Sequence, residues 1–173
     1  MDEIFQRAKK VKVLLLDVDG ILTDGKIIFT SSGEEIKCFS VFDGLGIKLL
    51  QNMGIEVGIL SSRISKPLEI RAKELGIKVV IQGELNKLEA FEKFLLETGI
   101  KPEEVAYMGD DLIDIPVLKK VGFAITVPNA WDLVKQYAHY VTKRPGGNGA
   151  VREVAEIILK AKGLWEKVLS YFS

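Results

Sequence analysis

Short apolar runs of strand length alternate along the chain with segments whose apolar residues recur at helical spacing. The strand-like runs are Val11 to Val18, Glu56 to Leu60, Lys78 to Ile81, Val105 to Met108, Phe123 to Thr126 and Tyr140 to Thr142. Strands that alternate with helices in this way are typical of α/β proteins. The pattern therefore predicts a doubly wound, parallel, Rossmann-like sheet with flanking helices.

Helix signals lie between several of these runs. Asn86 to Thr98 carries an apolar stripe, while Ser65 and Pro67 begin another helix that Gly76 ends. A later apolar stripe consists of Val151, Val154, Ile157, Ile158 and Ala161. A strand, a helix and a strand in succession require parallel pairing of the two strands, which fits the predicted sheet.

One segment departs from the alternation. Lys26 to Thr30 and Glu35 to Val41 are two short strand-like runs, and the turn-forming residues Ser31 to Glu34 separate them. This is a β-hairpin pattern. We expect a small β-hairpin flap at about 26–42, projecting beside the end of the first strand.

The composition is that of an ordinary globular domain, with 47% hydrophobic and 28% charged residues among 173. We expect one domain over 1–173, ending in a tail and helix at about 143–173. Lys plus Arg and Asp plus Glu both number 24, so no overall charge favours nucleic acid or a membrane as partner. Cys38 is the only cysteine, which excludes an internal disulfide. The charged start, Met1 to Lys12, lacks a signal-peptide core, so we expect a cytoplasmic protein.

Two carboxylates lie where the first apolar run ends. Asp17 lies near the end of that run, and Asp19 follows it directly before Gly20. The carboxyl ends of parallel strands form ligand-binding crevices, and two close carboxylates repel unless a cation neutralises them. Mg²⁺ prefers carboxylate oxygens together with water and phosphate. We therefore expect a magnesium ion between Asp17 and Asp19.

A second acidic cluster follows the run Val105 to Met108. Asp110 can complete the magnesium shell, and Asp111 and Asp114 can support it from the first turn of the next helix. Ser61 and Lys87, which lie between the two clusters along the chain, offer a hydroxyl and an ammonium to a phosphate. The set predicts phosphoryl transfer.

The same residues suggest a reaction in two steps. Asp17 attacks phosphorus to give an aspartyl phosphate, while Asp19 protonates the leaving oxygen and then activates water. The phosphoryl charge is then shared by magnesium, Ser61, Lys87 and backbone amides.

In order, Asp17-Val18-Asp19-Gly20, Ser61, Lys87 and Gly109-Asp110-Asp111 with Asp114 resemble the four motifs of the haloacid dehalogenase superfamily. The resemblance implies that Asp17 is the nucleophile and Asp19 the general acid/base. It implies that Ser61 and Lys87 bind phosphate. The implied magnesium ligands are Asp17, Asp110 and, through its backbone carbonyl, Asp19.

Nearly the whole chain resembles the branch of that superfamily that hydrolyses 3-deoxy-D-manno-octulosonate 8-phosphate. The segments that match are Asp17 to Gly25, Asp43 to Ile47, Gln82-Gly83 with Asn86-Lys87, Gly109 to Asp114 and Gly146 to Glu153. The resemblance implies a magnesium-dependent homotetramer acting in lipopolysaccharide biosynthesis. There are two departures from the pattern: Ser61-Ser62-Arg63 replaces Thr-Gly-Arg, and Phe42 stands where an arginine is frequent.

Further residues are candidates for binding the substrate. They are Ser62, Arg63, Asp43, Gly44, Arg144 and Arg152. Asp43 can instead be the N-cap of a helix from Gly44 to Met53, and the arginines of the tail can form surface ion pairs. His139 and Cys38 are expected to be structural.

The chain has no room for a cap domain, so either the substrate is large or a neighbouring subunit acts as a lid over the site; we expect the neighbouring subunit. Two alternatives remain open. The first is the same chemistry on another sugar-acid phosphate, such as a nonulosonate 9-phosphate. The second is a receiver-type signalling domain, which also combines an aspartyl phosphate, an acidic metal cluster, a hydroxyl and a lysine.

Overall fold

The structure is a computed structural model that describes residues 2–173, so Met1, the first residue of the charged start, lies outside the described residues. Six parallel strands form one sheet in the order β5-β4-β1-β6-β7-β8. They are β1 (Val13–Leu16), β4 (Glu56–Leu60), β5 (Val79–Ile81), β6 (Val105–Met108), β7 (Phe123–Thr126) and β8 (Tyr140–Val141). The predicted fold class is confirmed, although β1 is shorter than the predicted run Val11 to Val18.

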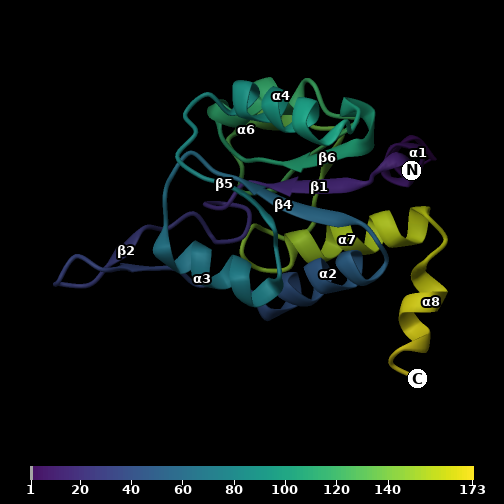
Figure 1. The fold of residues 1–173 in the computed structure, drawn as a ribbon, viewed down its shortest axis with the longest axis horizontal. Coiled ribbons are helices and arrows are strands. Elements are labelled where there is room, and N and C mark those ends of the chain that lie inside the picture. Colours follow the sequence, from purple (N-terminus) through teal and green to yellow (C-terminus); the bar gives the residue numbers. More distant parts are fainter. Residues whose placement is uncertain (1) are drawn as a thin grey trace.

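Helices cover both faces of the sheet (Figure 1). One face carries α1 (Asp2–Lys10), α2 (Val41–Asn52), α3 (Lys66–Leu75), α7 (Ala150–Ala161) and α8 (Trp165–Ser170). The other face carries α4 (Lys87–Thr98), α5 (Ile115–Leu118) and α6 (Asp132–Lys135). Two 3₁₀ turns, Pro102–Glu104 and Leu112–Asp114, complete the order.

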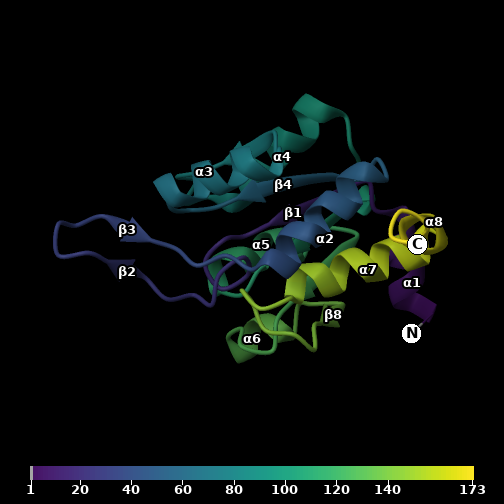
Figure 2. The same ribbon diagram turned by 90° about the horizontal axis from the view of Figure 1, so that it is seen from below.

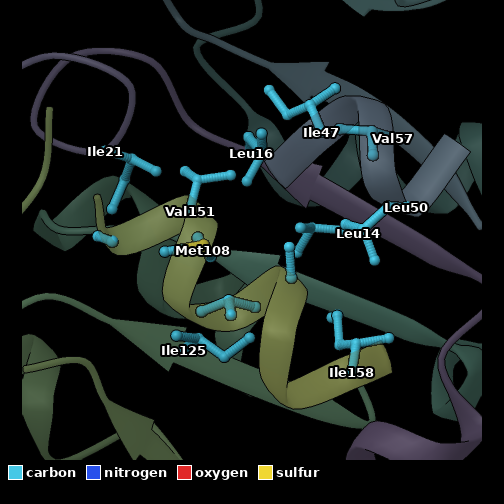
Figure 3. Close-up of a cluster of buried hydrophobic side chains, with 14 of the residues drawn as sticks. Leu14, Leu16, Ile21, Ile47, Leu50, Val57, Met108, Ile125, Val151 and Ile158 are labelled. Atoms are coloured by element: carbon cyan, nitrogen blue, oxygen red, sulfur yellow. The ribbon is translucent and has the colours of Figure 1, made fainter. Parts of the chain in front are cut away.

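The two faces of β1 supply two separate cores. Leu14 and Leu16 pack under α2 and α7, whereas Val13 and Leu15 pack under α4 and α5. Alternate side chains of a strand point to opposite faces, so an uninterrupted apolar strand is buried on both. Figure 3 shows the first of these cores between the sheet and the inner side of α7.

Helix ends follow the local signals in most places. Ser65 accepts a hydrogen bond from the N–H of Leu68 at the start of α3, and Gly76 ends that helix in the left-handed region with φ 69°. For α2, the helix before α3, the interpretation of Asp43 as the N-cap was wrong. α2 begins at Val41 and its N-cap is Ser40, so Asp43 lies within the first turn.

The predicted hairpin is present as β2 (Ile28–Phe29) and β3 (Glu35–Ile36), which pair antiparallel. It extends well away from the sheet and helices (Figure 2). The flap is shorter than the predicted 26–42, because Ser40 already caps α2. Its exposed apolar side chains are Ile27, Ile28, Phe29 and Ile36.

The C-terminal segment is only partly packed. Val168 in α8 is buried in the core, whereas Leu169, Tyr171 and Phe172 remain exposed. Within residues 2–173, no helix combines the length and the apolar character that a bilayer crossing requires.

Candidate active site

The candidate site lies at the point where the strand order changes direction. β4 and β5 lie on one side of β1, and the later strands β6, β7 and β8 lie on the other. β1 is central, with β4 on one side and β6 on the other, and Leu16 at its end is level with Ile59 and Met108. Asp17, Ser61 and Asp110 therefore follow three adjacent strands at one edge of the sheet. Crevices at such switch points are the usual ligand sites of open parallel sheets.

A buried lysine connects two of the acidic residues. Lys87 is the first residue of α4, which Asn86 caps, and its side chain has no exposed surface. Its Nζ lies 2.8 Å from Oδ1 of Asp17 and 2.6 Å from Oδ1 of Asp114. Burial is tolerated because the ammonium faces two carboxylates, whose charges outweigh desolvation and raise the pKa of Lys87.

Asp114 organises the loop after β6. Its Oδ2 accepts the backbone N–H groups of Asp110 at 2.9 Å and Asp111 at 3.0 Å. Its Oδ1 accepts the hydroxyl of Tyr107 at 2.6 Å, and the same hydroxyl lies 3.2 Å from Nζ of Lys87. The expected supporting position of Asp114 is thus where the structure places it. The role of Tyr107 was not predicted, because a tyrosine in an apolar strand is expected to be an ordinary core residue.

Three carboxylates converge in a way that suits a divalent cation. One oxygen from each of Asp17, Asp110 and Asp114 lies within 4.8 Å of the others. Burial raises the pKa of Asp17, with Asp114 adding to the effect and Lys87 opposing it. Burial also raises the pKa of Asp110, and the charges of Asp17 and Asp114 raise it further. Three carboxylates face one ammonium, so a divalent cation would neutralise the remaining charge.

Gly20 makes the close approach of Asp110 possible. Its φ is +92°, and a Cβ at this position would lie 1.9 Å from Oδ2 of Asp110. Only glycine fits a left-handed turn with a carboxylate against it. The glycine of the Asp-x-Asp-Gly motif therefore has a steric explanation.

The carboxylate of Asp19 does not belong to that group, contrary to the expected pairing with Asp17. Its Oδ1 contacts Nζ of Lys37, and its Oδ2 lies 3.2 Å from Nη1 of Arg63. Glu35 Oε1 lies 3.3 Å from Lys37 Nζ and 2.8 Å from Arg63 Nη2. We call Asp19, Lys37, Glu35 and Arg63 the four-charge ring. Two cations hold this carboxylate on the side of the hairpin, away from the three acids.

Lys37 and Glu35 were not identified from the sequence as site residues, because charged residues of a hairpin are expected to be exposed to solvent. A signal was present: Glu35 and Lys37 stand at alternate positions of the predicted run Glu35 to Val41, the second strand-like run of the hairpin. Alternate positions of a strand share a face, so both side chains can point to the same neighbour.

Ser61 lies at the end of β4 and is buried, with its Oγ 3.3 Å from the N–H of Arg63 that it accepts. The adjacent Ser62 is partly buried. The N–H of Ser61 donates to the carbonyl of Ile81, so this turn brings the Ser61 hydroxyl and the backbone amide of Ser62 to the carboxyl end of the central strands, next to Asp17. It is a geometry suited to oxyanions.

The carboxylate of Asp43 caps the N-terminus of α7, although Asp43 itself lies in α2. Its carboxylate accepts the N–H groups of Gly149 at 3.4 Å and Arg152 at 3.1 Å, at the start of α7. Burial raises the pKa of Asp43, and these backbone hydrogen bonds oppose the rise. Gly44, next in α2, leaves room for Arg71, whose Nη2 would lie 2.4 Å from a Cβ.

Arg144 and Arg152 line a groove of about 600 Å³ beside α2. Its other lining residues are Phe42, Leu45, Lys143, Asn148, Gly149, Glu153 and Glu156. Nε of Arg152 lies 3.0 Å from Oε1 of Glu156, so this arginine forms the ion pair that was the alternative interpretation. His139, expected to be structural, accepts the backbone N–H of Ala124 at 2.9 Å, and Cys38 is exposed.

A sequence profile of the haloacid dehalogenase-like hydrolases matches residues 57–154, which is more than half of the chain. The chain belongs to the haloacid dehalogenase-like hydrolases. The matched residues include Ser61, Lys87 and Asp110. Membership in a family of hydrolases decides against the receiver-type alternative.

Relatives of this hydrolase extend the match over almost its full length. It is 47% identical over 161 residues to the 3-deoxy-D-manno-octulosonate 8-phosphate phosphatase KdsC of Yersinia pestis, covering 93% of this chain and 86% of that protein. KdsC of Escherichia coli strain K12 is 47% identical with the same coverage.

A solved structure of a similar protein covers the entire hydrolase. The 3-deoxy-D-manno-octulosonate 8-phosphate phosphatase of Moraxella catarrhalis, in complex with a magnesium ion, a phosphate ion and KDO, aligns with a TM-score of 0.98. It is 45% identical, and the alignment covers 100% of this chain and 99% of that chain.

Proposed function

We propose that this hydrolase is a magnesium-dependent phosphatase that converts 3-deoxy-D-manno-octulosonate 8-phosphate to the free sugar acid and phosphate. The observation that carries the proposal is the full-length match to a phosphatase whose structure holds magnesium, phosphate and KDO. The buried Asp17, Lys87 and Asp114 cluster supports the same chemistry from the residues themselves. The enzyme would act in the cytoplasm, in lipopolysaccharide biosynthesis, as one domain over 1–173.

In the first step, Asp17 attacks phosphorus, the bond from phosphorus to the sugar oxygen breaks, and Asp19 gives that oxygen a proton. In the second step, Asp19 takes a proton from water, the water oxygen bonds to phosphorus, and the carboxylate of Asp17 is released. Ser61 and the amides after it stabilise the charge on the phosphoryl oxygens, and Lys87 holds the nucleophilic carboxylate.

The residues fit a magnesium ion. Asp17 and Asp110 would hold it with their carboxylates and Asp19 with its backbone carbonyl, while Asp114 and Asp111 support the loop. When bound, magnesium supplies positive charge to the phosphoryl oxygens. Burial raises the pKa of both Asp17 and Asp110, and the charge of Asp114 raises both further, so a cation among these three acids would offset their repulsion.

The sugar acid also presents a carboxylate, for which the groove of Arg144 and Arg152 is the candidate. Lys143 in the same groove adds a third cation. Arg152 would exchange Glu156 for the substrate, or Arg144 would bind it alone. Ser62, Arg63, Asp43 and Gly44 are the remaining candidates for substrate contacts.

Four subunits would complete the site, with a neighbour acting as the lid. The hairpin supports this arrangement because it presents Phe29 and Ile36 to solvent on a ribbon of two paired strands, whose outer edges are open to a further strand. Sedimentation equilibrium would test it: a homotetramer is expected, and a monomer with full activity would contradict the lid.

The function itself is tested by phosphate release from 3-deoxy-D-manno-octulosonate 8-phosphate, a nonulosonate 9-phosphate and other sugar phosphates, with and without Mg²⁺. We expect strong preference for the octulosonate, dependence on magnesium and loss of turnover in Asp17→Asn. Asp132→Asn is the matched control, because Asp132 is an exposed aspartate that pairs with Lys135 on the surface of α6. Preference for the nonulosonate would replace the substrate and retain the chemistry. Turnover that survives Asp17→Asn would refute the mechanism.

A further inference from the structure

The four-charge ring joins the hairpin to the carboxylate of Asp19. Lys37 follows β3, and its side chain is only 1% exposed although it carries a charge. Burying an ammonium is unfavourable unless acceptors surround it. Lys37 has two, Asp19 and Glu35, and they come from different parts of the chain.

Both oxygens of the Asp19 carboxylate are held. Lys37 contacts Oδ1 and Arg63 contacts Oδ2, so the carboxylate has little freedom to rotate about its terminal bond. Glu35 bridges the same two cations from the other side, which closes the ring. Charges in the ring alternate in sign, so every neighbouring pair attracts.

The ring is anchored to the body of the protein. Oε2 of Glu35 accepts the hydroxyl of Ser65 at 2.6 Å, and Ser65 is the N-cap of α3. The backbone N–H of Ser65 donates to Oε1 of Gln82 at 2.9 Å. The position of Lys37 is thus fixed relative to α3 as well as to the rest of the hairpin.

We propose that Lys37, held by Glu35, is a positioning residue that orients the Asp19 carboxylate for proton transfer to the leaving oxygen. The inference rests on the proposed function. Lys37 acts through Asp19 and does not itself touch the reacting atoms. Because proton transfer by a placed acid contributes about 10²- to 10⁴-fold to a rate, loss of its orientation gives a measurable defect.

The test compares leaving groups. The alkoxide of a sugar phosphate needs a proton as it leaves, whereas p-nitrophenolate leaves without one. In the magnesium-loaded protein, Lys37→Met should lower kcat/KM for the sugar phosphate about tenfold or more, and that for p-nitrophenyl phosphate by less than about threefold. Asp19→Ala should likewise lower kcat/KM much more for the sugar phosphate than for p-nitrophenyl phosphate. Lys37→Arg, which keeps a positive charge, should retain most of the wild-type kcat/KM for the sugar phosphate. Lys26→Met is the control, because Lys26 is an exposed lysine near the start of the hairpin that pairs with Asp24.

A double variant separates positioning from structural support. If Lys37 acts only through Asp19, Lys37→Met should change kcat/KM by less than about twofold once Asp19 is Ala. Equal losses for both leaving groups, or additive losses in the double variant, would overturn the proposal. If Lys37→Met does not fold, Glu35→Gln takes its place with the same criteria. A wild-type protein that hydrolyses neither substrate would instead refute the proposed function.

Discussion

Removal of one buried hydroxyl tests how the acidic cluster is held together. Tyr107 is fully buried, and its hydroxyl donates to Oδ1 of Asp114 over 2.6 Å. Burial and the nearby charge of Asp114 hold the pKa of Tyr107 well above its usual range, so the hydroxyl keeps its proton. Tyr107→Phe deletes this donor and leaves the ring in place.

The expected effect follows from the charge on the acceptor. A hydrogen bond to a charged group contributes about 1.5–3 kcal/mol, more than a bond between neutral groups. Removing one hydroxyl leaves no cavity large enough for water, so the lost bond is not replaced. We expect the free energy of unfolding to fall by about 2 kcal/mol, which lowers the Tm of a chain of this size by about 4–8 °C.

Urea denaturation at neutral pH measures this directly, since a lower midpoint with an unchanged slope reports lost stability. Tyr137→Phe is the matched control, because within residues 2–173 the Tyr137 hydroxyl makes no hydrogen bond and its ring is only partly buried. If the two variants lose equal stability, the bond to Asp114 is not a strong one and the role assigned to Tyr107 is wrong.

Further predictions concern Gly20, His139 and Asp43. Gly20→Ala should raise the magnesium concentration needed for half-maximal activity, since its Cβ displaces Asp110; Gly33→Ala, with φ +86° but open space around it, should not. The pKa of His139, the chain's only histidine, should lie below 6.5 by NMR, because partial burial and then the charge of Arg7 lower it. His139 of the unfolded chain then binds a proton more readily than His139 of the folded protein. The contribution of neutral His139 to the free energy of unfolding is therefore present above pH 6.5 and is lost as the pH falls through the folded pKa. A measured pKa above 6.5 would contradict this prediction. Asp43→Ala should reduce the unfolding free energy by about 1–2 kcal/mol in urea, and by more than Asp43→Asn, which keeps an acceptor for α7.

The sheet and the acidic motifs could be predicted because each depends on local pattern. Apolar runs such as Glu56 to Leu60 became strands, and the residues directly after them, such as Asp17 and Ser61, became the site. In a parallel sheet the strand ends meet, so order along the chain is enough to bring them together.

The partners of those residues could not be predicted in the same way. Tyr107 and Lys37 act through side chains that reach across elements, and their neighbours depend on how helices and the hairpin are placed. The interpretation of Asp43 as the N-cap of its own helix was wrong for the same reason: it caps α7, more than a hundred residues later in the chain. Tertiary contacts of this kind leave no local pattern.

The hairpin leaves the sheet after β1 and returns before α2, and its tip extends away from both (Figure 2). At that tip, a Cβ added to Gly33 would meet no atom of residues 2–173 within 4 Å, apart from its chain neighbours. Residues added there would lengthen the ribbon without shifting the register of any of the six strands. Evolution can therefore vary the length and surface of this segment independently of the reaction centre. If the hairpin contributes to the proposed lid between subunits, selectivity among sugar acids and the pairing of subunits are the properties that can diverge by this route.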